Sequence, residues 1–512
     1  MQLESGCGGR RMRKFSNMKW MAAVLAMGMV LAGCNTGGTA QYTTLFEKDS
    51  IIDIHIEMDE EDWAAILADA TAEEYYSADV TVDGTTVSDV GVRAKGNSSL
   101  MSVAGSDSDR YSLRVKFDKY VDDQNLRGLD EFVLNNCFND PSYMREYLTY
   151  EAFRELGADT PLTVYANVYV NGELFGFYLC VEDVDDSFLE REFGDNDGNL
   201  YKAGEKSTLA ADSNLDTFSL ENGDDEELSG LQKLTDILNA MPYGDKGDIE
   251  SVLDVDSALK YMAVNTVLGS YDSYLGDKAQ NFYLYEEDGI CKVIPWDYNM
   301  SFGGYTGDSG ASTTIPIDEP VYGVTIESRP MVQKLLAVDE YLVKYHGYIE
   351  ILTTYLVGLA DRTEELAAII RPYVEADPSS FYTTQEFDDA ITVHEEGIQI
   401  TNTQIPAGIS DDFAQVTPGA VPDDMAQITP GAMPESGQSE MPDGVPGERP
   451  SGGAGGFPGG NAGERPDKNQ GGGGMQGGGM QGGMPVNSIP VSILDYAAAR
   501  LASIEQQLSE NG

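Results

Sequence analysis

The sequence predicts an α+β protein with a β-rich N-terminal lobe and a mostly helical C-terminal part. Strand-like alternation with turn signals fills residues 44–117, whereas helical periodicity dominates residues 230–270 and 330–375. Apolar residues make up 41% of the 512-residue chain, so a sizeable core is possible and the chain is too apolar to be disordered throughout.

The N-terminal lobe is predicted from several short strands. Residues 51–56 partly alternate between apolar and polar side chains, residues 79–82 lead into an Asp-Gly turn, and residues 87–92 follow that turn. Residues 59–70 place apolar side chains at helical spacing, which predicts one short amphipathic helix within this lobe.

A better-marked helix and a hairpin follow this lobe. Asp140 suits the N-cap of a helix, Pro141 suits its first turn and Gly157 suits its end. An Asn-Gly dipeptide then joins the apolar runs 164–170 and 174–181, and this dipeptide strongly indicates a two-residue hairpin turn.

Residues 1–33 have the features of a secretory signal peptide. A basic stretch precedes the apolar run 20–31, which is too short for a comfortable membrane span. The run ends in Leu-Ala-Gly before Cys34, which resembles a bacterial lipobox. A lipid on Cys34, with a linker over 34–44, would then hold the protein on the extracytoplasmic face of the cell membrane. The alternative is a plain secretory signal with an incidental cysteine.

Residues 405–487 differ from the rest of the chain in composition. They hold 22 of its 56 glycines and include a near-duplicate over 411–434, which favours a disordered, acidic Gly/Pro-rich insertion. A docking or modification site is an alternative role for the duplicate. Helical periodicity resumes over 493–507, so residues 488–512 are expected to form a helix that docks on a domain spanning 45–400.

Charge and histidine content exclude some classes of function. The 86 acidic and 32 basic residues give a net charge of −54, and removing residues 1–33, with five basic residues and one acidic residue, makes it −58. Such a surface repels nucleic acid. Three scattered histidines leave little material for a His-rich zinc site or a Ser-His-Asp triad, so acid–base chemistry is expected from carboxylates.

The candidate chemistry lies between Asp272 and Asp297. Apolar runs on both sides of an Asp-Gly turn predict a hairpin with Asn281 at its entrance and Asp297 just past its exit. A carboxylate and an amide oxygen at one edge suit Mg²⁺ held on phosphates, and an upstream Asp would orient or deprotonate an accepting hydroxyl. Asp272 and Asp277 both precede Asn281, and spacing alone does not choose between them.

Several segments of the chain resemble motifs of the spore coat protein H (CotH) kinase family. They are Val92–Ser99, Tyr111–Lys119, Asn139–Arg145, Tyr169–Tyr178, Asp272–Tyr274 and Pro295–Asn299. The resemblance implies an atypical, two-lobed protein-kinase-like fold that binds ATP and a divalent metal, Mg²⁺ or Mn²⁺, and phosphorylates protein Ser residues. It also implies that Asp272 is the catalytic aspartate, in preference to Asp277, and that Asp297 is a metal ligand.

Nucleotide contacts are expected from residues of the N-terminal lobe. Lys116 lies in an alternating run that suits a phosphate-neutralising lysine, and Lys95 and Arg93 lie beside a Gly-Asn-Ser-Ser stretch whose amides suit phosphate. Glu182 closes a strand where a hinge would contact adenine. A glutamate on the following helix would pair with the lysine, and the candidates are Glu146 and Glu151. A solvated surface position is the alternative for each of these residues.

The predicted function is transfer of the ATP γ-phosphoryl group to Ser of a surface or coat protein. A Ser-rich, basic acceptor would suit the acidic surface electrostatically. One alternative is a non-catalytic adhesin or interaction module that keeps the kinase-like fold. Another is a glycoside hydrolase, which needs two carboxyl groups on either side of a sugar cleft, and the sequence singles out no such pair.

Overall fold

The computed structural model describes residues 40–306, 309–394 and 491–511. The predicted signal peptide at 1–33, the lipidation site at Cys34, most of the 34–44 linker and the 405–487 insertion lie outside the described residues. None of the described helices is both long and apolar enough to cross a membrane.

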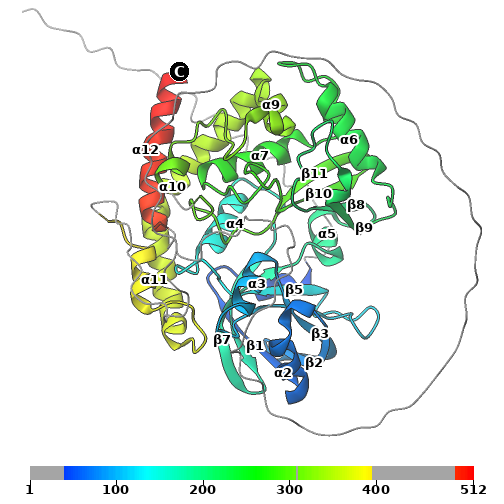
Figure 1. Ribbon diagram of the computed structural model, residues 1–512, viewed down its shortest axis with the longest axis vertical. Coiled ribbons are helices and arrows are strands. Elements are labelled where there is room, and N and C mark those ends of the chain that lie inside the picture. Colours follow the sequence, from blue (N-terminus) through cyan, green and yellow to red (C-terminus); the bar gives the residue numbers. More distant parts are fainter. Residues whose placement is uncertain (1–39, 307–308, 395–490, 512) are drawn as a thin grey trace, which may run out of the picture. The chain divides into compact units, whose positions relative to one another are not determined.

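The N-terminal part is a closed β-barrel (Figure 1). Its strands are β1 (Ile51–Met58), β2 (Tyr76–Val82), β3 (Thr85–Lys95), β4 (Ser112–Lys116), β5 (Glu131–Asn135), β6 (Thr163–Val170) and β7 (Glu173–Glu182). Neighbouring strands follow the order β1-β2-β3-β4-β5-β7-β6, and the parallel pairing of β1 with β6 closes the barrel. Closure leaves no strand edge exposed, and alternate residues such as Ile54, Val80, Val92 and Leu113 fill the interior.

A second, 4-stranded antiparallel sheet belongs to the C-terminal part. Its strands are β8 (Asn199–Ala203), β9 (Phe218–Asn222), β10 (Phe282–Glu287) and β11 (Ile290–Pro295), in the order β11-β10-β8-β9. The β10–β11 hairpin is the one predicted from the Asp-Gly turn, and this prediction is confirmed. Strands β8 and β9 are not predictable from the sequence, because these short segments show no clear alternation of apolar and polar residues.

Helices make up most of the C-terminal part. Two short helices, α2 (Glu60–Ala68) and α3 (Ser98–Ala104), lie between strands of the barrel. The other described α-helices are α4 (Arg145–Glu155), α5 (Asp186–Phe193), α6 (Ser229–Ala240), α7 (Val255–Val267), α8 (Ser309–Thr313), α9 (Pro330–Leu336), α10 (Asp339–Ala376), α11 (Thr384–Ala390) and α12 (Ile493–Asn511). Helix α7 packs against β11 and α10, and α12 packs against α10. The predicted α+β class, with a sheet-rich N-terminal part and a helical C-terminal part, is confirmed.

Helix α4 begins four residues later than predicted, with Met144 rather than Asp140 as its N-cap residue. The Asp140 carboxylate instead closes the turn before the helix, where it accepts hydrogen bonds from the backbone N–H groups of Ser142 (3.0 Å) and Arg145 (2.9 Å). Asn139 and Tyr143 have φ angles of +63° and +60°, which are left-handed and incompatible with a helix. The predicted start at Asp140 is therefore wrong, and the Asp-Pro pair builds the turn that leads into the helix.

The two described chain ends beside residues 395–490 are joined by hydrogen bonds. Asp495 on α12 accepts from the backbone N–H of His394 (2.8 Å) and lies 2.7 Å from its Nδ1 atom, while Ser492 donates to the carbonyl of Thr392 (2.6 Å). The fully buried Arg500 then fixes α12 to the domain by donating to backbone carbonyls of three residues, Thr266, Thr313 and Ile315.

Candidate active site

Asp297 lies two residues past β11, and its surroundings hold it in an unusual backbone conformation. Its φ angle is +65°, and its backbone N–H donates to the Tyr150 hydroxyl on α4 (3.2 Å). The chain just after it is fixed to the same helix, because Arg145 donates to the carbonyls of Ser301 (2.6 Å) and Phe302 (3.1 Å). Contacts from α4 on both sides of Asp297 therefore fix the position of the segment that carries its carboxylate.

The Asp297 carboxylate has no hydrogen-bonding or ionic partner among the described residues. Burial raises the pKa of Asp297, and the positive charges of Lys95, Lys202 and Lys278 oppose that rise. Within residues 40–306, 309–394 and 491–511, no side chain forms a hydrogen bond or an ion pair with this carboxylate. It is therefore available to bind a ligand.

Asp272 lies in the loop after α7, and Asn281 precedes β10. The Asn281 amide donates to the main-chain carbonyl of Asp272 (2.7 Å), and Gln280 donates to the Asp272 carboxylate (2.7 Å). Burial and then the negative charge of Asp297 raise the pKa of Asp272 to about 6. Since Phe282 pairs with Pro295, Asn281 and Asp297 lie at the same end of the β10–β11 hairpin, as predicted.

Asp277 occupies a different position. Its side chain is exposed, and its carboxylate accepts a hydrogen bond from the Tyr305 hydroxyl (2.6 Å). Asp272 is instead half-buried and lies within the electrostatic influence of Asp297. The arrangement therefore favours Asp272 as the functional carboxylate of the two.

Lys95 and Glu146 are connected through Asn135. Lys95, at the end of β3, donates from Nζ to Oδ1 of Asn135 (3.1 Å), and Nδ2 of Asn135 donates to Oε2 of Glu146 in the first turn of α4 (2.8 Å). Burial and the charge of Asp297 raise the pKa of Glu146 to about 7. One amide thus links a barrel lysine to a helix glutamate, and the positive charge of that lysine acts on Asp297.

Lys116 and Arg93 lie away from this group. Lys116 pairs with Asp118 (3.2 Å) and Glu131 (3.4 Å), and it lies opposite Gly91, four residues before Lys95 on β3. At roughly 3.3 Å per residue, this places it ~13 Å along the strand from the level of Lys95. Arg93 lies two residues before Lys95 on the same face of β3, but it forms an ion pair with a nearby glutamate, Glu73.

Glu182 and Glu151 are committed to ion pairs elsewhere. The fully buried Glu182 carboxylate accepts hydrogen bonds from the Tyr42 hydroxyl, the Arg191 guanidinium and the Leu162 backbone N–H. Glu151 pairs with two basic residues, Lys48 and Arg362. Of the two glutamates predicted on the helix, the structure therefore brings only Glu146 to the lysine, and it gives the Glu182 side chain a role in packing.

The residues at the end of the β10–β11 hairpin suit a magnesium ion that is coordinated partly by protein oxygens and partly by phosphate oxygens. In the part of the chain that the structure describes, no group of three or more His, Cys, Asp or Glu side chains could hold a metal ion unaided. Mg²⁺ commonly takes one or two carboxylates and completes its octahedron with phosphate oxygens and water. The unpartnered carboxylate of Asp297 and the amide oxygen of Asn281 meet that requirement.

Three further residues near the candidate site carry little or no signal in the sequence. Asn135 ends a short strand, Lys202 lies on the unpredicted strand β8, and Lys278 adjoins Asp277 in the loop before the hairpin. No motif marks the first two, since their relevance depends on strand pairing. Lys278 lies within the block that carries the candidate chemistry, and its positive charge was the available signal.

Comparison with known proteins agrees with the resemblance to the CotH kinase family that the sequence motifs indicate. A family model described as CotH kinase protein matches residues 92–400. Inner spore coat protein H of Bacillus subtilis (strain 168) is 26% identical over 279 residues, which are 51% of this chain and 74% of that protein. The family model spans more than half of the chain and includes Lys95, Glu146, Asp272 and Asp297. The chain therefore belongs to the CotH kinase protein family.

Proposed function

We propose that this protein is an atypical kinase that transfers the γ-phosphoryl group of ATP to serine side chains of a protein. The observation that carries the proposal is the convergence of Asp272 and Asp297 at one end of the β10–β11 hairpin. Lys95, connected to Glu146 through Asn135, supplies a cation beside them. Phosphoryl transfer depends on such positioning and electrostatic stabilisation rather than on covalent chemistry by the protein.

In the proposed reaction, Lys95 binds phosphate oxygens of ATP and holds the triphosphate toward the hairpin. Asp272 orients the serine hydroxyl and accepts its proton as the oxygen attacks the γ-phosphorus. The bond between the γ-phosphorus and the β,γ-bridging oxygen breaks, so the products are phosphoserine and ADP. Asp297 and Asn281 would hold Mg²⁺ or Mn²⁺, which neutralises charge on the phosphates when it is bound.

The two-lobed, kinase-like arrangement is part of this proposal, with the barrel as one lobe and the helical part as the other. The relative named as an inner spore coat protein supports a coat or surface location. We extend this to a lipid anchor on Cys34 at the extracytoplasmic face of the membrane. A Ser-rich, basic protein segment is the acceptor that best suits a chain with a net charge of −54.

Incubation with γ-labelled ATP, Mg²⁺ or Mn²⁺ and a Ser-rich basic acceptor tests the activity. We expect metal-dependent label, and a loss of at least ~100-fold in Asp272→Asn and Asp297→Asn, which keep side-chain size but remove a charge. Asp277→Asn is the matched control and should keep most of the activity. An active Asp272→Asn protein combined with an inactive Asp277→Asn protein would move the catalytic role to Asp277.

A non-catalytic surface module is the competing outcome. It would be supported if no acceptor, including the protein itself, became labelled and if ATP with metal did not raise the melting temperature. ATP bound to the native state raises the melting temperature by mass action even without turnover. The thermal measurement therefore separates a protein that binds no nucleotide from a kinase tested with the wrong acceptor.

A further inference from the structure

Lys202 contacts the same aromatic pair as Lys95. Strand β8 pairs with β10 so that Lys202 lies opposite Tyr283, and its Nζ lies 5.4 Å from the centroid of that ring. The Tyr283 ring meets Trp296 edge-on at 5.8 Å, and Nζ of Lys95 lies 5.9 Å from the Trp296 centroid. Because Trp296 directly precedes Asp297, two ammonium groups from two different sheets approach the candidate site.

The positive charge around Asp297 contrasts with the acidic composition of the chain. The sequence has 86 acidic and 32 basic residues, yet Lys95, Lys202 and Lys278 all act on the one carboxylate of Asp297. Burial disfavours the ionised form of Asp183, just after β7, but the charges of Arg114 and Lys202 outweigh burial and lower its pKa. Such a gathering of cations in an acidic protein favours an anionic ligand.

Lys202 differs from two other lysines, Lys116 and Lys278, in having no ionic partner within the described residues. Lys116 pairs with Glu131, and Lys278 pairs with Glu205 at 3.6 Å. Across residues 40–306, 309–394 and 491–511, by contrast, nothing forms a hydrogen bond or an ion pair with the half-buried side chain of Lys202. A half-buried ammonium without a direct hydrogen bond or ion pair gains from an anionic ligand, because its lost hydration is otherwise poorly compensated.

We propose that Lys202, on the four-stranded sheet, and Lys95, on the barrel, both bind the polyphosphate of a nucleoside triphosphate. This inference rests on the proposed function, because the ligand is the phosphoryl donor of that reaction. Lysine binds phosphate as a point charge, so the interaction strengthens with the charge of the ligand. Lys202 should therefore contribute to ATP binding far more than to AMP binding.

Calorimetric titration of the full-length protein with AMP, ADP and ATP in Mg²⁺ tests this assignment without requiring turnover. In Lys202→Met we expect the Kd for ATP to rise at least tenfold, the Kd for ADP to rise less and the Kd for AMP to change less than twofold. Lys202→Arg should restore most of the ATP affinity. Lys233→Met removes the same charge from an exposed site on α6 and should leave all three values unchanged. If Lys202→Met does not fold, Lys202→Gln gives the same comparison.

Three outcomes would overturn the assignment. An unchanged Kd for ATP in Lys202→Met would show that Lys202 does not contact the phosphates. An equal loss for all three nucleotides would indicate a role in base binding or in packing. If the wild-type protein bound no ATP, the proposed function would fail first and the assignment with it, whereas ATP binding with an unaffected Lys202→Met protein would refute the assignment alone.

Discussion

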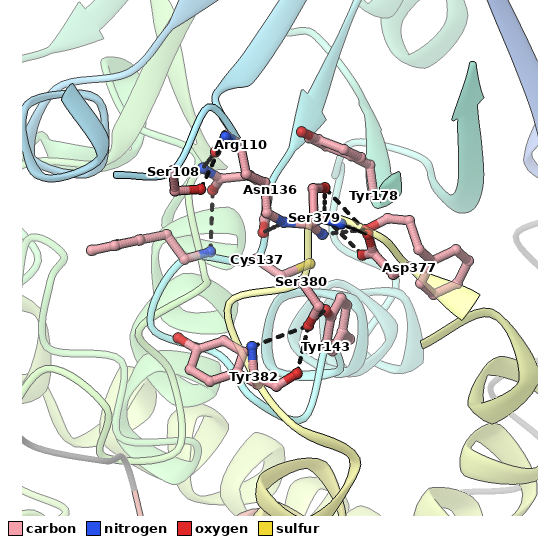
Figure 2. Close-up of polar contacts among 12 residues, drawn as sticks. Ser108, Arg110, Asn136, Cys137, Tyr143, Tyr178, Asp377, Ser379, Ser380 and Tyr382 are labelled. Carbon is pink, nitrogen blue, oxygen red and sulfur yellow. Dashed lines mark hydrogen bonds and ion pairs between the residues drawn. The ribbon is translucent and has the colours of Figure 1, made fainter. Parts of the chain in front are cut away.

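Arg110 and Asp377 form an ion pair in which both side chains are completely shielded from solvent, with Nη1 and Oδ2 2.7 Å apart. Figure 2 shows the Arg110 guanidinium directed at Asp377 and Ser379, which follow α10. Arg110 also donates to the backbone carbonyls of Asn136 and Phe177. A single side chain before β4 thus fixes the end of the longest described helix to the barrel, next to the turn that leads into α4.

Removing one partner of this pair should destabilise the fold strongly. Asp377→Ala leaves the Arg110 charge buried, so we expect a loss of about 3 kcal/mol in the free energy of unfolding, measured with urea. Glu375→Ala is the control, because Glu375 makes an exposed pair with Arg371 on the same helix and should cost less than about 1 kcal/mol. Equal losses in the two variants would contradict the prediction.

Removing the Asn135 side chain should weaken the use of ATP as a substrate, measured as kcat/KM, as well as lower stability. Asn135→Ala removes both bonds of the Lys95–Asn135–Glu146 connection, and hydrogen bonds to charged groups contribute about 1.5–3 kcal/mol. We therefore expect kcat/KM for ATP to fall at least ~10-fold, mainly through KM. Initial rates at varied ATP measure this.

A surface asparagine provides the comparison for Asn135. Asn167 on β6 donates to Asp53 at an exposed position on the barrel, so Asn167→Ala loses a side-chain hydrogen bond away from the site. Its KM for ATP should equal that of the wild-type protein. The prediction for Asn135 is wrong if Asn135→Ala lowers the melting temperature while its KM for ATP stays at the wild-type value.

Asp256 should make stability depend on acid pH. Burial raises the pKa of Asp256, but hydrogen bonds from Lys344, Tyr348 and Lys260 lower it to about 2. A carboxyl group whose pKa is depressed on folding stabilises the folded state above its ordinary pKa of 3.8 and loses that effect as the pH falls toward 2. Because the side chain is 35% exposed, we expect Asp256→Asn to cost about 1 kcal/mol at pH 7 after solvent screening.

Urea unfolding at several pH values tests this expectation. The difference between wild type and Asp256→Asn should be constant from pH 7 to pH 5 and should disappear near pH 2. Glu364→Gln also removes one negative charge, from an exposed position on α10, and should show no such dependence. A difference that persisted unchanged at pH 2 would exclude ionisation of Asp256 as its cause.

The elements that were correctly predicted are those whose signals are local. The 164–170 and 174–181 runs became β6 and β7 because an Asn-Gly turn needs no distant partner. Asp140 misled the helix prediction, since an Asx turn and an N-cap use the same side chain and differ only in the backbone that follows.

The sequence by itself determined the α+β class, the family motifs, and the pair of polar residues at the end of the β10–β11 hairpin. Only the tertiary structure decided which lysine and which glutamate accompany them. Lys95 and Lys116 occupy similar alternating strands, but strand register places Lys95 at Asp297 and leaves Lys116 beside Glu131. Hairpins form from contacts between near neighbours, whereas the Lys95–Asn135–Glu146 connection depends on three elements packed around one barrel end. Pairing across such distances leaves no mark in the local pattern of residues.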